Sequence, residues 1–136
     1  MTDIHTYSMQ LPSDRLNVAA VEPFVLSIPE ARQLSRERFH DLLLALTEAV
    51  NNAIYHGNKN NPAKSVQIGF ENLEKKITFT VSDEGQGFDY NGLPDPTDPK
   101  NIDKPNGRGV FLMKNLADNV EFSRNGQEVL LTFVLN

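Results

Sequence analysis

The strongest helical pattern in the chain is SRERFHDLLLALTEAVNNAIYHG, residues 35–57. Ser35 can cap the start of this helix with its side-chain oxygen, and Gly57 is a natural stop. The apolar residues between them follow the 3.6-residue period, which places them on one face of the helix. They are Phe39, Leu42, Leu43, Leu46, Ala49, Val50 and Ala53. The pattern therefore predicts a long helix with one face buried in a core.

Alternating apolar residues before and after this helix predict five strands. The strands lie at residues 4–11, 65–71, 76–82, 120–124 and 128–136. The second and third strands flank a turn-like NLEK sequence, and the last two flank the turn pair Asn125-Gly126. Because short turns join neighbouring antiparallel strands, each of these pairs predicts a hairpin.

Two further segments have helical spacing. Residues 17–34 form the first, although Pro23 and Pro29 argue against a single unbroken helix. Residues 110–120 form the second, after a stretch at 83–109 that is rich in Gly, Pro, Asp and Asn. Helices and hairpins in one short chain predict an α/β (α+β) two-layer sandwich, in which helices cover one face of a mixed, mostly antiparallel sheet. We expect a single domain over residues 1–136.

The composition narrows the classes of function. The chain has 18 acidic and 13 basic residues, a net charge of −5 and no Lys/Arg block, which argues against direct nucleic-acid binding. The absence of cysteine excludes disulfides and thiolate metal sites. The first residues lack the apolar segment of a signal peptide, and no apolar run is long enough to cross a bilayer. We therefore expect a cytoplasmic protein with no membrane partner.

Glu48 and Asn52 lie four residues apart on the long predicted helix and therefore share a face, away from the apolar stripe. Carboxylate and amide oxygens suit Mg²⁺, which keeps several waters and takes further ligands from substrate phosphates. A solvated helix face that binds nothing is the alternative, because this pair occurs on many exposed helices. The pair alone leaves both interpretations open.

A carboxylate and two glycines follow the predicted strand 76–82, in the sequence Asp83-Glu84-Gly85-Gln86-Gly87. Glycine lets the backbone approach a flat ligand closely, and Asp83 can accept a hydrogen bond from an exocyclic amine such as that of adenine. A plain glycine turn at the end of a strand explains the same residues equally well.

The helix predicted at 110–120 begins directly after Asn106-Gly107-Arg108-Gly109. Glycines at a helix start can leave backbone N–H groups available to phosphate oxygens, and the helix dipole favours negative charge there. A flexible junction with an exposed Arg108 is the alternative. The order of the three features along the chain carries more information than any one of them.

With the three motifs in this order, the sequence resembles the Bergerat-fold (GHKL) ATPases. EAVNNAIYHGN, residues 48–58, looks like their N box; DEGQG, residues 83–87, looks like their first glycine box; and GRGVFLMKNLAD, residues 107–118, looks like their second. The likeness runs from about Ser35 to the C-terminus. Within the superfamily, the sequence is most similar to the anti-sigma factor serine kinases.

The resemblance implies a Bergerat ATP-binding fold with ATP and Mg²⁺ as cofactors. It makes Glu48 the candidate general base, Asn52 the Mg²⁺ ligand and Asp83 the acceptor for the adenine amine. Other candidates would shape the base pocket, border the phosphates or form one end of an ATP lid. They are Gly85 and Gly87 at the base, His56 and Lys59 beside the phosphates, and Gly107, Arg108, Gly109, Val110 and Phe111 at the lid. For His56 and Lys59, a surface role at the helix end is the alternative.

The leading hypothesis is a protein serine/threonine kinase that phosphorylates a serine of an antagonist (anti-anti-sigma) protein and sequesters a sigma factor. The resemblance also implies a homodimer. Many members of this fold carry a Gly-Thr pair at the entry to the last strand, where this chain has Gly126-Gln127. The missing hydroxyl supports an alternative, a non-catalytic module whose nucleotide gates a protein interface. A third hypothesis is an α/β domain without a nucleotide site, in which every glycine is a turn.

Overall fold

The computed structural model describes residues 6–87, Thr97 and 108–135 of the chain. A short strand and three short helices precede the long helix. A π-helical turn, two strands, a helix, a strand, a short 3₁₀ helix and a last strand are described after it. In chain order these are β1 (Thr6–Pro12), a 3₁₀ helix (Arg15–Ala20), α1 (Val21–Leu26), α2 (Pro29–Arg32), α3 (Arg36–Asn52), a π-helical turn (Ala53–Gly57), β2 (Ser65–Asn72), β3 (Lys76–Ser82), α4 (Arg108–Leu116), β4 (Asn119–Ser123), a 3₁₀ helix (Arg124–Gly126) and β5 (Glu128–Val134).

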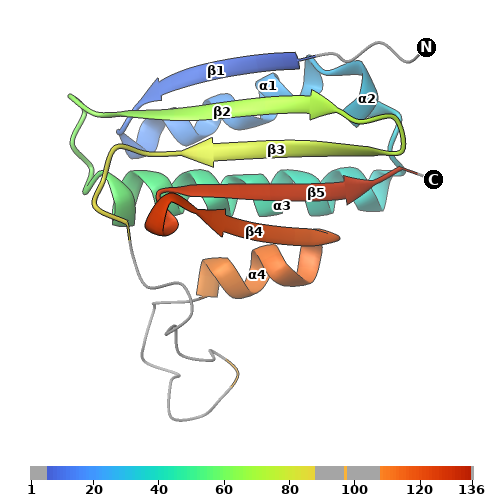
Figure 1. Ribbon diagram of the computed structural model, residues 1–136. Coiled ribbons are helices and arrows are strands. Elements are labelled where there is room, and N and C mark those ends of the chain that lie inside the picture. The colour runs from blue at the N-terminus through green and yellow to red at the C-terminus, as the bar shows by residue number, and fades with distance from the viewer. Residues whose placement is uncertain (1–5, 88–96, 98–107, 136) are drawn as a thin grey trace.

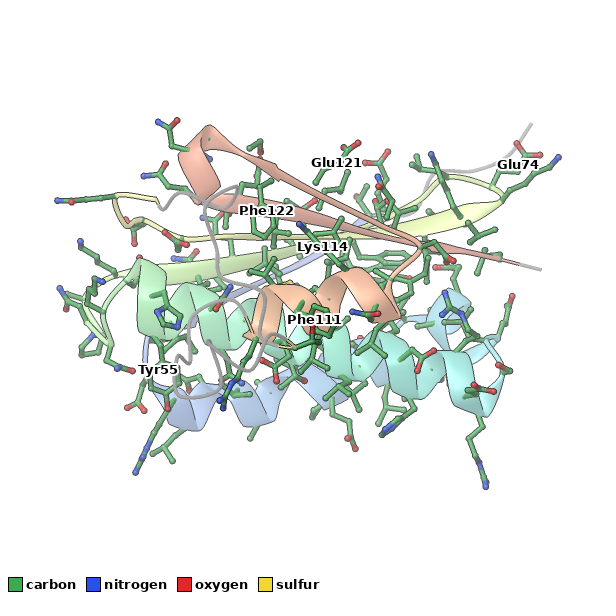
Figure 2. The ribbon with its side chains drawn as sticks, turned by 90° about the horizontal axis from the view of Figure 1, so that it is seen from below. Tyr55, Glu74, Phe111, Lys114, Glu121 and Phe122 are labelled. Carbon is green, nitrogen blue, oxygen red and sulfur yellow. The ribbon has the colours of Figure 1, made fainter. Side chains whose placement is uncertain are left out.

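The strands form one five-stranded sheet in the order β1-β2-β3-β5-β4. All four neighbouring pairs are antiparallel. The helices lie together on one face of this sheet, with α3 running behind the central strands (Figure 1) and α4 beside it (Figure 2). The predicted two-layer sandwich is confirmed, and no parallel pair occurs among the described strands.

The core lies between the sheet and α3. Ile77, Phe79 and Val81 alternate along β3 toward the helices and are at most 2% exposed. Phe79 packs against Phe70 of the neighbouring strand, with ring centroids 5.2 Å apart. On α3, the 3.6-residue period predicted the burial of Leu42, Leu46, Ala49 and Val50, which the structure confirms. Phe39 and Leu43 of the same predicted stripe are only partly buried. The other sheet face is mostly polar, with Leu130 and Val134 of β5 as exceptions, and such a face is common in antiparallel sheets covered on one side.

The predicted helix boundaries change in the structure. The helix predicted at 110–120 was wrong at both ends: residues from Arg108 are already helical, and α4 ends at Leu116, because Asn119 and Val120 pair with β5. The segment 17–34 is divided before Pro29, as that proline suggested, whereas Pro23 lies within the first turn of α1. Pro29 opens α2, where its missing N–H costs no helical hydrogen bond. No helix in the described part of the chain is long and apolar enough to span a membrane.

The long helix begins and ends where its sequence predicted. The Ser35 side chain accepts a hydrogen bond from the backbone N–H of Arg38 at 3.2 Å. After Asn52 the helix widens into the π-helical turn, whose bond from Asn58 N to Ala53 O measures 2.8 Å. Single π turns are rare and are frequently found at functional sites. This turn connects α3 to the residues that surround the site described below.

Arg38 holds α4 in place against α3. Its guanidinium donates to the Leu116 carbonyl at 3.1 Å and to the Asp118 carboxylate at 2.6 Å, and it lies 5.6 Å from the centre of the Phe133 ring. Asp118 also accepts a hydrogen bond from the backbone N–H of Val134 at 2.7 Å. The C-terminal end of α4 is therefore fixed to both layers, which sets the position of its N-terminal end.

Candidate functional site

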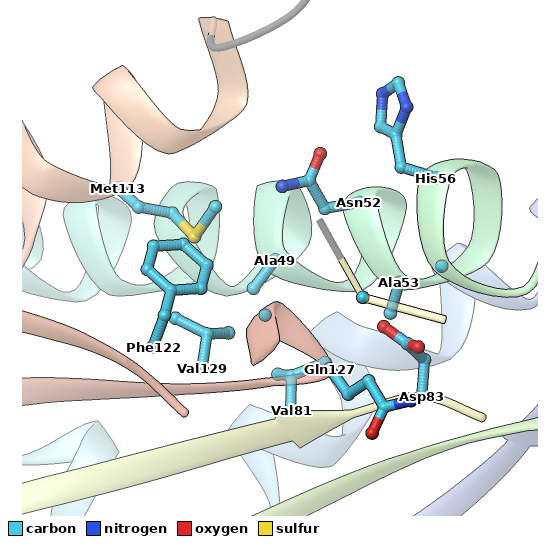
Figure 3. A pocket seen from close by; sticks show the side chains of 13 residues that line it. Ala49, Asn52, Ala53, His56, Val81, Asp83, Met113, Phe122, Gln127 and Val129 are labelled. Atoms are coloured by element: carbon cyan, nitrogen blue, oxygen red, sulfur yellow. The ribbon is translucent and has the colours of Figure 1, made fainter. Parts of the chain in front are cut away.

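A pocket opens where the end of α3 faces the ends of β3 and β5 (Figure 3). Apolar side chains from the core form its inner wall, and polar groups lie around its rim. The lining residues are Ala49, Asn52, Ala53, His56, Gly57, Val81, Asp83, Gly87, Met113, Phe122, Gly126, Gln127 and Val129. The fold thus brings together members of the predicted N box and first glycine box.

Asp83 lies at the end of β3 with its carboxylate directed toward the helix (Figure 3). Its backbone N–H donates to the Gln127 carbonyl at 2.9 Å, which continues the pairing of β3 with β5. Its Oδ1 accepts the N–H of Gly85 at 2.8 Å. Burial raises the pKa of Asp83, while the Gly85 hydrogen bond and the positive charges of Arg124 and Lys64 act in the opposite direction.

Three glycines allow the backbone to close around Asp83. A Cβ at Gly57 would overlap the Asp83 carboxylate, and a Cβ at Gly85 would overlap the carbonyl of Gly57. Gly87 has a φ of +81°, and a Cβ there would overlap the carbonyl of Asn125. Any side chain at these positions would force the turn apart.

Glu48 and Asn52 face the first turn of α4. A Cβ at Gly109 would lie 3.1 Å from Oε2 of Glu48 and 3.7 Å from Oδ1 of Asn52. The structure therefore places the predicted N-box pair beside Gly109 of the second glycine box. Asn52 also lines the pocket, whereas Glu48 lies beyond its lining.

These oxygens fit a magnesium-bound nucleotide better than a protein-only metal site. The described residues contain no group of three or more His, Cys, Asp or Glu side chains that could hold a metal ion. A divalent cation at Asn52 would need other ligands, and Mg²⁺ usually takes these from phosphate oxygens and water. The space left by the missing Cβ of Gly109 is next to both side-chain oxygens.

The other predicted lid and phosphate residues lie in different surroundings. Gly107 is outside the described residues, and Arg108 is exposed at the first position of α4. Val110 is 5% exposed and belongs to the core. Phe111 is 38% exposed and lies on the side of α4 away from the sheet (Figure 2). A nucleotide contact through Val110 or Phe111 stays a prediction.

His56 and Lys59, the two predicted phosphate neighbours, are not alike. His56 lines the pocket from the π-helical turn, close to Asn52 (Figure 3). Lys59 is exposed just beyond that turn, with a φ of 55°. Only His56 is among the residues that surround the pocket.

Sequence reasoning missed Gly57 and the part that Gln127 plays. Gly57 was identified only as a helix stop, yet it packs directly against Asp83. Gln127 was noted for the hydroxyl it lacks, whereas its Nε2 donates to the Gly85 carbonyl. Gln127 directly precedes β5, and the pairing of Ser82 with Glu128 in the structure places it beside Asp83.

The chain belongs to the histidine kinase-like ATPase domain family, whose pattern it matches over residues 11–133. It is similar to the serine-protein kinase RsbW of Staphylococcus aureus (strain JH9), at 30% identity over 132 residues, which cover 91% of this chain and 83% of the relative. RsbW of Oceanobacillus iheyensis is 26% identical over 129 residues, which cover 90% of this chain and 82% of the relative. These matches confirm the superfamily that the three motifs predicted and, within it, the serine-kinase branch.

Proposed function

We propose that this single-domain chain binds Mg·ATP in the pocket at the end of α3 and transfers the γ-phosphoryl group to a serine of an antagonist protein. The main observation is that one pocket is lined by both Asp83 and Asn52, and that Asn52 and its neighbour Glu48, just beyond the lining, lie beside Gly109. The 30% identity to a serine-protein kinase over 91% of the chain supports this class of reaction.

The adenine base would lie at the Asp83 end of the pocket. Oδ1 of Asp83 is occupied by the Gly85 N–H, so Oδ2 is the proposed acceptor for the exocyclic amine. Val81, Met113 and Val129 supply an apolar wall of the kind that suits a flat ring. Gly85 and Gly87 keep the backbone close enough to enclose the base.

The phosphates would lie between Asn52 and the first turn of α4. Asn52 would bind Mg²⁺, which neutralises phosphate charge when bound, and the N-terminal N–H groups of α4 with Arg108 and Gly109 would face phosphate oxygens. His56 would border the same region. Glu48 would orient the serine hydroxyl and accept its proton as the Oγ–phosphorus bond forms and the bond to the β-phosphate oxygen breaks.

The proposal extends to regulation. When it is not acting on the antagonist protein, the chain would sequester a sigma factor. It would act as a homodimer in the cytoplasm. The support is the resemblance of the N box and second glycine box to anti-sigma serine kinases.

Two experiments test the proposal, calorimetry with ADP first and a phosphate-transfer assay second. Purified protein titrated with ADP in Mg²⁺ should bind at one site per chain, and absence of binding would overturn the proposal. Radiolabelled ATP should then label a serine of an antagonist protein encoded next to this chain's gene. That label should disappear when the acceptor serine is replaced by alanine.

A non-catalytic module is the second candidate, and Gln127 favours it. The Gln127 amide occupies the pocket wall where many members of the fold have a threonine hydroxyl. In this alternative, nucleotide only sets the shape of a protein-binding surface. ADP binding without any phosphate transfer to the antagonist would support the module over the kinase.

A further inference from the structure

A buried polar cluster lies next to the pocket without lining it. Asn58 is 1% exposed and Ser13 is 0% exposed, and both carry polar side chains. The Asn58 amide makes three hydrogen bonds. Its Nδ2 donates to Ser13 Oγ at 2.7 Å and to the Ser65 carbonyl at 2.9 Å, and its Oδ1 accepts the backbone N–H of Glu84 at 2.8 Å. Both amide hydrogens and the amide oxygen are thus used.

The third of these bonds acts directly on the proposed base site. The Glu84 N–H belongs to the peptide that joins Asp83 to Glu84, so the bond to Asn58 fixes the orientation of that peptide. The same turn contains the bond from Gly85 N to Asp83 Oδ1 at 2.8 Å. A rotation of the Asp83–Glu84 peptide would therefore move the carboxylate that is proposed to read the base.

The other two bonds anchor Asn58 itself. Ser13 also donates its hydroxyl to the Lys64 carbonyl at 2.8 Å, and its backbone N–H donates to the same carbonyl at 3.0 Å. Ser65 begins β2, so the amide is tied to the segment between β1 and the first helical turn and to the start of a central strand. A side chain fixed by two hydrogen bonds can hold a third group in one orientation.

Gln127 holds the turn from the opposite side. Its Nε2 donates to the Gly85 carbonyl, and its backbone carbonyl accepts the Asp83 N–H at 2.9 Å. Gln127 lines the pocket and could contact a ligand itself. Asn58 does not line the pocket, so its influence on a ligand passes through the turn alone.

We propose that Asn58 is a positioning residue for nucleotide binding: its amide oxygen holds the Glu84 N–H and thereby sets the Asp83 carboxylate at the base. The inference rests on the proposed nucleotide site. It adds a residue from the end of the N box that touches no nucleotide and yet determines affinity.

Three variants separate positioning from general stability. Asn58→Ala removes all three bonds. Asn58→Asp keeps an oxygen for the Glu84 N–H and loses the two donor bonds, while Ser13→Ala disturbs the anchor and leaves the Glu84 bond in place. Each variant is measured for its ADP dissociation constant in Mg²⁺, its thermal midpoint and the exchange rate of the Glu84 amide by NMR without nucleotide.

Asn58→Ala should weaken ADP binding by about fivefold or more, the effect of one lost hydrogen bond on a fixed group, and should speed exchange of the Glu84 amide. Asn58→Asp should bind ADP more tightly than Asn58→Ala even where its thermal midpoint is as low or lower. Ser13→Ala should stay within about twofold of the parent in ADP affinity.

The proposal is overturned if ADP affinity follows the thermal midpoint across the three variants, or if Glu84 exchange is unchanged in Asn58→Ala. Failure of the parent protein to bind ADP would instead remove the proposed function. In that case the exchange measurement still decides whether Asn58 holds the turn.

Discussion

The two ends of the pocket are built in different ways. The Asp83 end is formed mainly by backbone: three glycines permit contacts that no Cβ would allow. The turn is held by the hydrogen bond that Asn58 accepts from the Glu84 N–H and by the one that Gln127 donates to the Gly85 carbonyl. At the other end, Asn52 lines the pocket and Glu48 lies just beyond it, and both side chains face the start of a separate helix. The Asp83 end depends on the close packing of its backbone, and the other end depends on the functional groups of its side chains.

This difference predicts opposite sensitivities. A change of volume should damage the Asp83 end, because close-packed backbone has no room to adjust. A change of charge with no change of volume should damage the Glu48 end, because proton transfer requires a group of suitable basicity. Binding and transfer should therefore be separable by choosing which end to alter.

The largest effect is expected from Glu48→Gln. The amide keeps the size of the carboxylate and cannot accept the serine proton, so phosphate transfer should fall on the order of 10²- to 10⁴-fold. ADP affinity should stay within about twofold, because the substitution leaves the base end intact. Rates of single-turnover transfer and calorimetry with ADP provide the two measurements.

Glu37→Gln is the matched control for that variant, because Glu37 is an exposed glutamate in the first turn of the same helix. It should transfer phosphate at the parent rate. If Glu48→Gln retained transfer, or lost ADP binding to the same extent, the division between the two ends would be wrong.

Asp83→Asn should produce the next largest effect, on binding. The amide would present a donor where the base offers its amine, and loss of a hydrogen bond to a charged group costs about 1.5–3 kcal/mol, or roughly 10- to 150-fold in ADP affinity. Stability at neutral pH should be unchanged or higher, because burial raises the pKa of Asp83 and its ionised form is disfavoured in the fold.

The measurements are ADP calorimetry and chemical denaturation without nucleotide. Glu121→Gln, an exposed carboxylate change on β4, should alter neither quantity. A variant that lost stability along with affinity would show that Asp83 serves the fold and not the ligand.

Much of this architecture could be predicted from the sequence, because it depends on local periodicity. The alternation in 65–71 and 76–82 predicted a hairpin that the structure confirms. The predicted end of α4 was wrong for a definite reason. Val120 lies four residues after Leu116 and so continues the helical spacing, although in the structure it belongs to β4 and pairs with β5. Periodicity alone cannot separate these two cases.

The contacts of the site depend on tertiary proximity instead. Gly57 and Asp83 belong to different motifs, and the contact between them appears only when the end of α3 meets the end of β3. The interaction of Gln127 with Gly85 likewise requires the register of β3 with β5. The motifs identified some residues that lie together, such as Asn52 and Asp83, but not those that hold the turn in shape.

Gly85→Ala should test the shape-dependent end with a smaller effect. Its Cβ would overlap the Gly57 carbonyl, and overpacking of this kind typically costs about 1–3 kcal/mol of stability. ADP affinity should fall as well, because the turn that holds Asp83 must move. Gly69→Ala is the control: Gly69 lies in β2 with nothing within 4 Å of an added Cβ, and its stability should change little. Urea denaturation measures the stability of both variants. Equal losses of stability in the two would show that the enclosure of Asp83 has no special role.

The smallest effect is expected from pH. Because burial raises the pKa of Asp83, the carboxylate takes up its proton at a higher pH than an exposed aspartate does. ADP affinity should therefore decline as the pH falls through that raised pKa, since the protonated group is a poorer acceptor for the base. The stability of the unliganded protein should change in the opposite sense. The folded state binds more protons than the unfolded state between the two pKa values, so stability contributed by this group rises as the pH falls through that window.

Asp83→Asn should remove both trends, whereas Gly85→Ala should weaken binding at every pH and leave the affinity trend in place. ADP titrations across mildly acidic pH would then separate the charge of Asp83 from the shape of the turn that holds it.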